Sequence, residues 1–211
     1  DYERAQDLRW PDGKILRLHD DGQIPKDNPF ADTKGALPEI WSLGHRNAQG
    51  LEYDPHGGLL WSSEHGPRGG DEGNVILAGH NYGWPRVSLG MEYDGSPIGQ
   101  GKPHGLDPET LEAPRIDWTP SLGVSGIDFY EGEAFPKWAH NLMVGTLSRN
   151  EVHRVVIRNG QATHSEVLIR DLGRIRDLAV GPRGRVYLLL EHGQGSRLVS
   201  ILPVATPKPS H

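Results

Sequence analysis

Arginine and amide side chains stand just before two strand-like segments that lie far apart in the sequence. Arg46 and Asn47 precede one apolar run, and Arg174 and Arg176 precede another. Guanidinium groups bind carboxylates through paired, charge-assisted hydrogen bonds. Like charges that converge on one place repel one another unless an anion lies between them. The pattern therefore indicates a candidate site for a ligand that carries several carboxylates.

The same arginines also have an ordinary structural interpretation. Each could be a solvated side chain, or could pair with an acidic residue such as Asp71, Glu72 or Asp177. Exposed ion pairs of this kind are common and contribute only about 0–1 kcal/mol to stability. At this point both interpretations stay open.

Oxygen ligands for a hard cation are concentrated in the segment from Glu64 to Glu72, which reads EHGPRGGDE. Calcium binds backbone carbonyls and carboxylates, and a Gly66-Pro67 turn can direct its carbonyl oxygens at one point. Asp71 adds a carboxylate close by. No EF-hand loop pattern occurs, so an ordinary turn with solvated acids is the structural alternative.

The sequence motifs of several other classes of catalytic, metal-binding and nucleotide-binding site are absent. The eleven histidines include no His-Glu-x-x-His pair, and the chain has no cysteine, no Gly-x-Ser-x-Gly elbow, no phosphate-binding loop and no dinucleotide fingerprint. The formal net charge is -6 with no basic block, which disfavours nucleic acid and anionic membranes as partners. No apolar run approaches the ~18 residues that a membrane span needs.

These residues must be positioned by short elements, because 28 glycines and 17 prolines divide the 211 residues into brief segments. Turn sequences such as Asp12-Gly13 and Asn159-Gly160 separate the apolar runs, which is typical of an antiparallel meander. Only 137–141 and 107–111 could form a turn of helix. The predicted strands are 14–18, 50–53, 59–62, 126–130, 141–146, 152–157, 177–180, 186–190 and 198–202.

An internal repeat specifies the architecture further. The segment 51–66 aligns without gaps on 178–193, and the two share the Leu, the Pro, the turn Gly and the final Glu-His-Gly. A shift that is a small multiple of ~40–50 residues, with a four-stranded meander in each unit, is typical of a β-propeller. A β-sandwich with accidental similarity is the alternative. Because each blade needs ~40–50 residues, the chain is long enough for about four blades.

The sequence predicts one domain over 1–202, a partial propeller with a long loop excursion at 88–118. The Pro-rich tail 203–211 is expected to be disordered or a linker. The chain begins at Asp1 without a Met or an apolar targeting segment, and it resembles the middle of a longer protein.

A group of motifs makes the chain similar to a known family, the soluble aldose sugar dehydrogenases of the glucose/sorbosone dehydrogenase type, which use pyrroloquinoline quinone (PQQ). The resemblance runs from about residue 6 to residue 202, and together its motifs are highly specific. They are GKILRL at 13–18, IPKDNPF at 24–30, GHRNAQG at 44–50, EHGPRGGDE at 64–72, NYGWP at 81–85, VSG at 124–126 and RIRD at 174–177.

The resemblance implies an all-β fold, a six-bladed β-propeller with PQQ in a groove over the central channel. It also implies the site residues. The residues that would bind PQQ are Arg46, Asn47, His65, Ser121, Arg174 and Arg176, where His65 replaces the Gln of some relatives. The carbonyls of Gly66 and Pro67 would hold the calcium that also binds PQQ, while Glu72 and the Tyr82 carbonyl match a second, structural calcium.

The family's reaction, by this resemblance, is oxidation of an aldose at its anomeric carbon. A general-base His takes the hydroxyl proton while hydride moves to the quinone, calcium polarises the quinone oxygen, and Arg46 stabilises the developing negative charge. No histidine in the chain matches that base, so the 211 residues alone are expected to be inactive. Ser148 also departs from the family, because it stands where relatives carry a cofactor-binding Lys.

The expected partners are an aldose sugar and an electron acceptor of unknown identity, with a periplasmic or secreted location. The sequence leaves the oligomeric state open, and a homodimer is one option. Two functions from other classes also remain. One is a non-catalytic propeller that binds another polyanionic ligand, and the other is a calcium-dependent propeller lactonase, which the arginine-rich lining disfavours.

Overall fold

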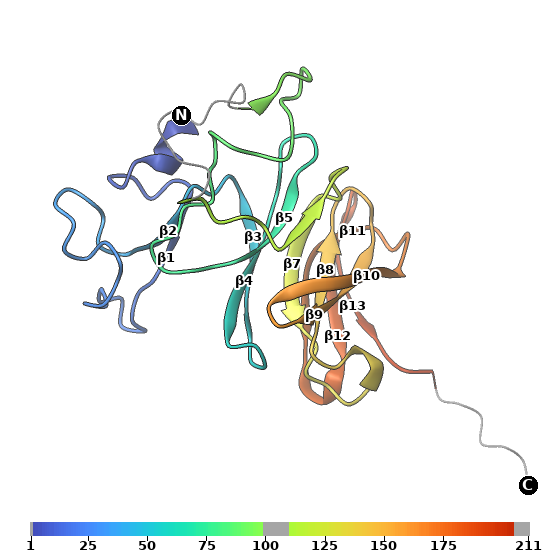
Figure 1. Ribbon diagram of the computed structural model, residues 1–211. Helices are drawn as coiled ribbons and strands as arrows, with labels where there is room; N and C mark the ends of the chain where they lie inside the picture. Colours follow the sequence, from blue (N-terminus) through green and yellow to red (C-terminus); the bar gives the residue numbers. More distant parts are fainter. Residues whose placement is uncertain (1, 99–109, 205–211) are drawn as a thin grey trace, which may run out of the picture.

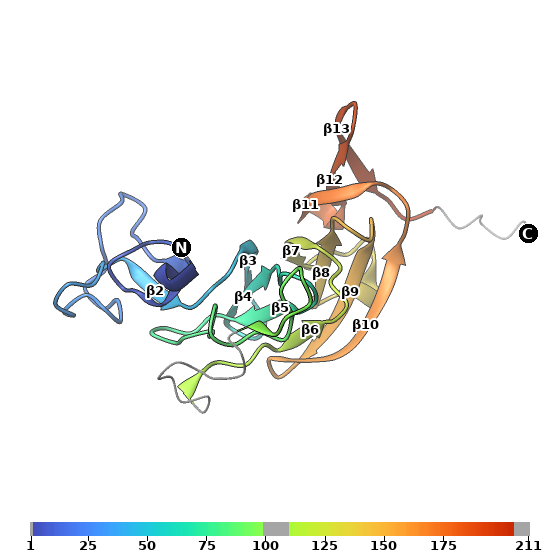
Figure 2. The same ribbon diagram turned by 90° about the horizontal axis from the view of Figure 1, so that it is seen from above.

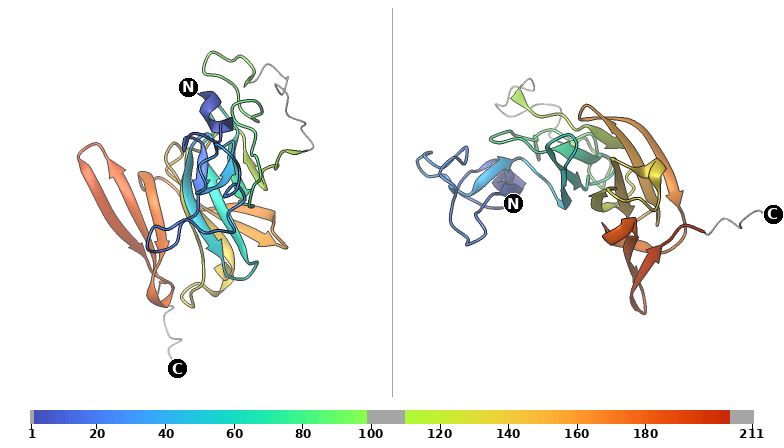
Figure 3. Two further views of the ribbon diagram at one scale, coloured as in Figure 1. Left: turned by 90° about the vertical axis from the view of Figure 1, so that its left-hand side faces the viewer. Right: turned by 90° about the horizontal axis from the view of Figure 1, so that it is seen from below.

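The computed structural model describes residues 2–98 and 110–204, and these residues form four antiparallel sheets in chain order (Figure 1). Figures 2 and 3 show that the sheets follow one another along an open arc, with the two ends of the chain on opposite sides of it. The prediction of an all-β fold with about four propeller blades is therefore confirmed.

The first two sheets contain the amino-terminal half. The first has two strands, β1 (Lys14–Leu16) and β2 (Ile40–Leu43). The second has four, in the order β3 (Ala48–Asp54), β4 (Leu59–Glu64), β5 (Asp71–Val75) and β6 (Ile116–Trp118).

The third sheet repeats the four-stranded meander with β7 (Val124–Phe129), β8 (Asn141–Thr146), β9 (Val152–Arg158) and β10 (Gln161–Ile169). The fourth has three strands, β11 (Arg174–Val180), β12 (Val186–His192) and β13 (Gly195–Ile201). Two of the four sheets are thus complete four-stranded blades.

The sequence repeat corresponds to a structural one. Segment 51–66 forms most of the β3–β4 hairpin and segment 178–193 most of the β11–β12 hairpin, which are the first two strands of their sheets. Trp61 and Leu188 occupy the same position in the repeat, and both are fully buried. Both turns use a glycine with positive φ, Gly58 at +67° and Gly184 at +75°, a conformation that residues with a Cβ adopt at a cost.

The first strands of the three larger sheets, β3, β7 and β11, lie side by side and are joined by polar contacts. The Ser63 hydroxyl on β4 donates to the Ser125 carbonyl at 2.5 Å, and the Ser125 hydroxyl donates to the Ile175 carbonyl at 2.6 Å. Further along the strands, the Val180 N–H donates to the Asp128 carboxylate at 2.6 Å. Because position 125 faces 175 and position 128 faces 180, β7 and β11 run in the same direction and begin at the same end.

The hydrophobic core lies between neighbouring sheets, as expected where meanders pack face to face. One cluster joins the second and third sheets and includes Trp61, Phe129 and Val155. Another joins the third and fourth and includes Met143 and Ile175. Full burial of one such side chain contributes roughly 1.5–3 kcal/mol, so these interfaces hold the strand ends of adjacent sheets in fixed relative positions.

Some local predictions were wrong. Four strands were not predicted, namely β2, β5, β6 and β10. β5 has the sequence DEGNV and pairs on both sides despite its polar composition. β6 ends the predicted excursion 88–118 and belongs to the second sheet, while 99–109 lie outside the described residues.

The helical content is small. A short 3-10 helix at Pro136–Trp138 overlaps the start of the predicted turn at 137–141. Two more 3-10 helices, Tyr2–Gln6 and Pro182–Gly184, were not predicted. The other predicted turn, at 107–111, falls largely outside the described residues, as does most of the tail 203–211. Within 2–98 and 110–204, no helix is long and apolar enough to cross a membrane.

Candidate functional site

The predicted site residues lie in the loops next to the first residues of β3, β7 and β11. Arg46 and Asn47 come immediately before β3, Ser121 comes shortly before β7, and Arg174 and Arg176 lie in the first half of β11. Because these strands are neighbours and β7 and β11 begin at the same end, residues from three sheets gather at one end of the array (Figure 1).

Arg46 and Asn47 are held by the carboxylate of Glu64 at the end of β4. The Arg46 N–H and the Asn47 N–H both donate to Glu64 Oε1, the latter at 3.2 Å. The Arg46 guanidinium donates to the carbonyls of His65 and Gly66 at 3.0 and 3.2 Å. Its central carbon also lies 5.3 Å from the Trp84 ring centroid, within the range of a cation–π contact.

The pKa of His65 is lowered from its ordinary value, which favours the neutral imidazole. Burial is the main cause, and the positive charges of Arg46 and Arg176 act in the same direction, while the Asp71 carboxylate opposes them. Its Nδ1 lies 3.5 Å from the Asn47 amide nitrogen, while its Nε2 is buried and has no hydrogen-bond partner in the described residues. A buried ring nitrogen without a partner is costly, so this atom is suited to contact a ligand.

The Gly66-Pro67 loop is compact. A Cβ on Gly66 would collide with the backbone of Gly69 and Gly70, so the loop can close on itself only with glycine at this position. The Gly66 carbonyl already faces a cationic group, the Arg46 guanidinium, and Pro67 is buried. The loop therefore directs the Gly66 carbonyl oxygen toward a positively charged group, the Arg46 guanidinium.

Asp71 joins this loop to the next sheet. It is almost fully buried, and its carboxylate accepts hydrogen bonds from the Gly66 N–H at 3.0 Å and from the Ser121 hydroxyl at 2.8 Å. It also accepts from the backbone N–H groups of 122, 123 and 124 at 3.0, 2.7 and 3.1 Å. The Asp71 carboxylate thus fixes the Gly66-Pro67 loop relative to the start of β7.

Ser121, predicted to contact the cofactor, has a structural role in this arrangement. Its hydroxyl donates to Asp71 and accepts from the Gly69 N–H at 3.0 Å. Ser148 lies beside the same segment, since its N–H donates to the Leu122 carbonyl at 3.1 Å, and its side chain is exposed. The position where relatives carry Lys is therefore next to the site.

Glu72 and Tyr82 line a small cavity of about 10 Å³ together with Glu64 and Gly44. That is about the room that one water molecule requires, and an ion of similar size fits it. Burial raises the pKa of Glu72 to about 8, and the nearby Glu64 carboxylate raises it as well. Two buried carboxylates at one cavity favour a cation.

Arg174 and Arg176 both pair with Glu191 at the end of β12, and the Arg174–Glu191 distance is 3.6 Å. The acidic partners suggested by the sequence, Asp71, Glu72 and Asp177, are not the ones used. All three side chains of this cluster are between 43% and 48% exposed, so the arginines remain open to a ligand. Arg176 is also near His65, because its charge affects the pKa of that ring.

Sequence reasoning gave no role to Ser42, His45, Glu64, Glu191 and His192, and it considered Asp71 only as a cation ligand or an arginine partner, not as the acceptor that joins two sheets. The repeat contains a signal for two of them, because Glu191 and His192 align with Glu64 and His65. His192 shares with His65 a buried Nε2 that lacks a partner in the described residues. Ser42 and Asp71 carry no such signal, because their partners depend on the packing between elements.

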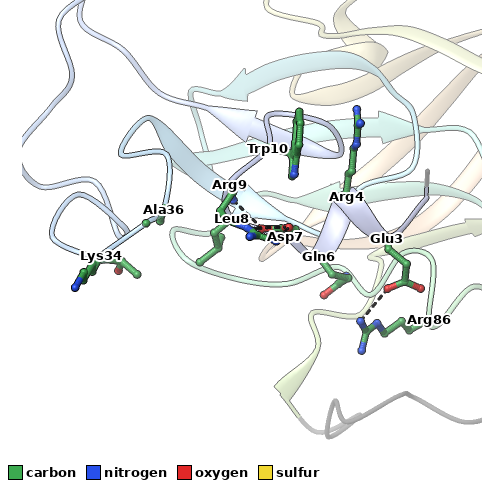
Figure 4. A pocket seen from close by; sticks show the side chains of 12 residues that line it. Glu3, Arg4, Gln6, Asp7, Leu8, Arg9, Trp10, Lys34, Ala36 and Arg86 are labelled. Atoms are coloured by element: carbon green, nitrogen blue, oxygen red, sulfur yellow. Dashed lines mark hydrogen bonds and ion pairs between the residues drawn. The ribbon is translucent and has the colours of Figure 1, made fainter.

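A larger cavity, of about 750 Å³, lies elsewhere, between the segment 3–10, the loop 33–36 and Arg86 (Figure 4). None of the predicted site residues lines it. Several of its charges are already paired, as in the contacts of Arg9 with Asp7 and of Arg86 with Glu3. This cavity is therefore not the candidate site.

The residues present fit both groups that the family resemblance implies. Two exposed arginines and the unpartnered His65 Nε2 suit a polycarboxylate quinone, and the Gly66 carbonyl and the buried Glu72 suit calcium. Within the described residues, no cluster of three or more His, Asp or Glu side chains forms a metal site, so main-chain oxygens would have to contribute ligands.

Comparison with known proteins identifies the family of the chain. Residues 1–200 match the family model "Glucose / Sorbosone dehydrogenase". The chain is 42% identical over 195 residues to the aldose sugar dehydrogenase YliI of Escherichia coli (strain K12), covering 92% of this chain and 52% of that protein.

Two solved structures are also similar. A glucose dehydrogenase crystal structure is 40% identical, with a TM-score of 0.90, and the match covers 97% of this chain and 58% of the other. The PQQ-bound aldose sugar dehydrogenase of Streptomyces coelicolor is 26% identical with a TM-score of 0.72, covering 95% of this chain and 55% of the other. The chain thus spans about half the length of these relatives. It belongs to the glucose/sorbosone dehydrogenase family.

Proposed function

We propose that the protein containing this chain oxidises aldose sugars at the anomeric carbon to lactones, using PQQ bound together with calcium. Family membership supports an oxidoreductase that acts on sugars. The PQQ-bound relative supports the choice of cofactor. The observation that carries the proposal is the set of arginines at the starts of β3 and β11, Arg46 before β3 and the partly exposed Arg174 and Arg176 within β11.

When bound, PQQ supplies a quinone that accepts hydride, and calcium supplies a Lewis acid. Arg174 and Arg176 would bind carboxylate groups, because their guanidinium groups are partly exposed at the start of β11. Arg46 stabilises negative charge that develops during the reaction. The neutral His65 offers its Nε2 as a hydrogen-bonding group, and Asn47 orients that ring.

Calcium would be held by carbonyl oxygens of Gly66 and Pro67, and a second, structural calcium by Glu72 and the Tyr82 carbonyl. The raised pKa of Glu72 supports the second assignment, because a buried carboxylate next to another carboxylate is stabilised by a cation. The buried Asp71 keeps the first loop in place without contacting the reactants.

The general-base histidine that the family mechanism requires is not identified in this chain. We therefore propose that residues 1–211 alone, with 1–202 as one partial propeller domain, show no turnover. The substrate class is an aldose, the electron acceptor is a separate molecule, and the location is periplasmic or secreted. Cell fractionation with an antibody against the chain tests the location.

Calorimetric titration of the full-length gene product with PQQ, with and without calcium, tests the cofactor assignment. We expect saturable binding that calcium strengthens. Absence of PQQ binding under both conditions would remove the dehydrogenase proposal. Hydrolysis of lactones without PQQ would support a propeller lactonase in its place.

A further inference from the structure

Three buried side chains form a hydrogen-bonded line next to Arg46. The Ser42 hydroxyl lies 2.8 Å from His45 Nε2, and His45 Nδ1 lies 3.0 Å from Glu64 Oε2. This order of Ser, His and acid resembles a hydrolase triad. The three residues are only 0%, 2% and 4% exposed, however, so no substrate can reach Ser42. The line must serve another purpose.

The two oxygens of Glu64 have different partners. Oε2 accepts the hydrogen bond from His45, and because a carboxylate can only accept, His45 Nδ1 must carry the proton. Oε1 accepts the backbone N–H groups of Arg46 and Asn47. Rotation of the carboxylate would leave two backbone donors without an acceptor, and each such loss is costly in a buried setting.

The ring of His45 is itself fixed by packing. It stacks on the Tyr82 ring with centroids 4.5 Å apart and planes inclined by 26°. Ser42 holds its other ring nitrogen. The imidazole of His45 therefore has one orientation. Its hydrogen bond fixes the Glu64 carboxylate, which in turn fixes the backbone of Arg46 and Asn47.

The backbone of Arg46 sets the direction of its guanidinium, which ends on the carbonyls of His65 and Gly66. We propose that His45 is a positioning residue for the cofactor site, which acts through Glu64 to hold Arg46 and Asn47 in the orientation that binds PQQ. This inference rests on the proposed function. It assigns His45 no contact with substrate or cofactor.

A matched pair of histidines allows a direct test. His153 is also buried and also pairs with a glutamate, Glu151, at 2.9 Å, but it lies at the start of β9. His45→Phe keeps a ring that can stack on Tyr82 and removes both hydrogen bonds. His153→Phe likewise removes a buried His–Glu hydrogen bond, but Glu151 accepts no hydrogen bond from Arg46 or Asn47. His45→Gln restores a donor for Glu64.

In the full-length protein with calcium, we expect His45→Phe to weaken PQQ binding at least tenfold, His45→Gln to recover part of the loss, and His153→Phe to change it less than twofold. In an Arg46→Ala/Asn47→Ala background, His45→Phe should have less than a twofold further effect. Equal losses of PQQ affinity in His45→Phe and His153→Phe would overturn the proposal. So would a full further loss when His45→Phe is added to the Arg46→Ala/Asn47→Ala variant.

Amide hydrogen exchange gives a result that does not depend on PQQ. His45→Phe should speed exchange at the Arg46 and Asn47 amides, whereas His153→Phe should not. If the wild-type protein fails to bind PQQ, the proposed function is lost, but this exchange difference still decides the role of His45. If His45→Phe does not fold, Ser42→Ala replaces it in this experiment. We then expect a smaller increase in exchange at the Arg46 and Asn47 amides. Unchanged exchange at these amides would contradict the role of His45.

Discussion

The carboxylate of Asp71 accepts a hydrogen bond from the hydroxyl of Ser121 at 2.8 Å and so joins the second sheet to the third. The same carboxylate holds the Gly66 N–H and three successive backbone N–H groups before β7. Neither residue has to touch a ligand for the site to depend on the pair, because the Gly66-Pro67 loop and the start of β7 meet there.

Asp71→Ala should destabilise the protein by at least ~3 kcal/mol, because it leaves several buried donors without an acceptor. Urea unfolding of the full-length protein measures the change. Asp21→Ala is the control, since Asp21 is exposed in a turn where it accepts from Gln23, and a change within ~0.5 kcal/mol is expected there. Similar losses in the two variants would contradict the central place of Asp71.

The sequence repeat provides a control position for a substitution in the Gly66-Pro67 loop. Gly66→Ala should lower stability by ~1–3 kcal/mol through overpacking, because the added Cβ collides with backbone atoms of Gly69 and Gly70. It should also reduce the rise in melting temperature that calcium produces. Gly193 occupies the same place in the repeat, and a Cβ there meets nothing within 4 Å. Gly193→Ala is therefore expected to keep the calcium effect, and a loss in both variants argues against a special role for the Gly66 loop.

Arg174→Ala and Arg176→Ala should each weaken PQQ binding at least tenfold, since a charge-assisted hydrogen bond contributes ~1.5–3 kcal/mol. Quenching of protein fluorescence during a PQQ titration measures the affinity. Arg158→Ala, an exposed arginine at the end of β9, serves as the control with no change expected. Unchanged affinity in both test variants would exclude these arginines from the site.

The pH dependence of stability should contain a contribution from Asp128. The pKa of this carboxyl is raised from 3.8 to about 6, mainly by burial and in smaller part by the charges of Glu52 and Asp177, against the lowering effect of the backbone N–H groups that it accepts. The folded state then binds the proton more tightly than the unfolded state, so the contribution is fully present below the unfolded pKa and is lost as the pH rises through about 6.

Asp128→Asn removes this titration and can still accept the Val180 N–H. Relative to wild type, the variant should gain stability between pH 4 and pH 7. Urea unfolding at several pH values measures the difference, and a difference that stays constant over this range would show that Asp128 does not titrate as described.

The sequence predicted the features that depend on local pattern. The repeat of 51–66 on 178–193 predicted two equivalent hairpins, and these are the first two strands of their sheets. The alternation of apolar residues located β7, β8, β9 and β12. The same repeat placed Arg46, Arg174 and Arg176 before or within the first strands of two equivalent hairpins, and both of these strands pack against β7.

Features that depend on packing between elements were not predictable in this way. β5 is polar because its Asp71 and Glu72 serve the site, so it lacks the alternation that marks a strand. The pairing of Arg174 and Arg176 with Glu191 depends on the register of β11 on β12. The contact of His45 with Glu64 joins residues 19 positions apart through the register of the β3–β4 hairpin, in which Ala48 pairs with Glu64.

Reduction of an artificial dye by the full-length protein, with calcium, PQQ and a panel of aldoses, tests the central claim most directly. We expect dye reduction that requires both PQQ and an aldose. We also expect Arg176→Ala to slow this reduction when PQQ is limiting. Absence of dye reduction with every aldose, in a folded protein supplied with PQQ and calcium, would contradict it.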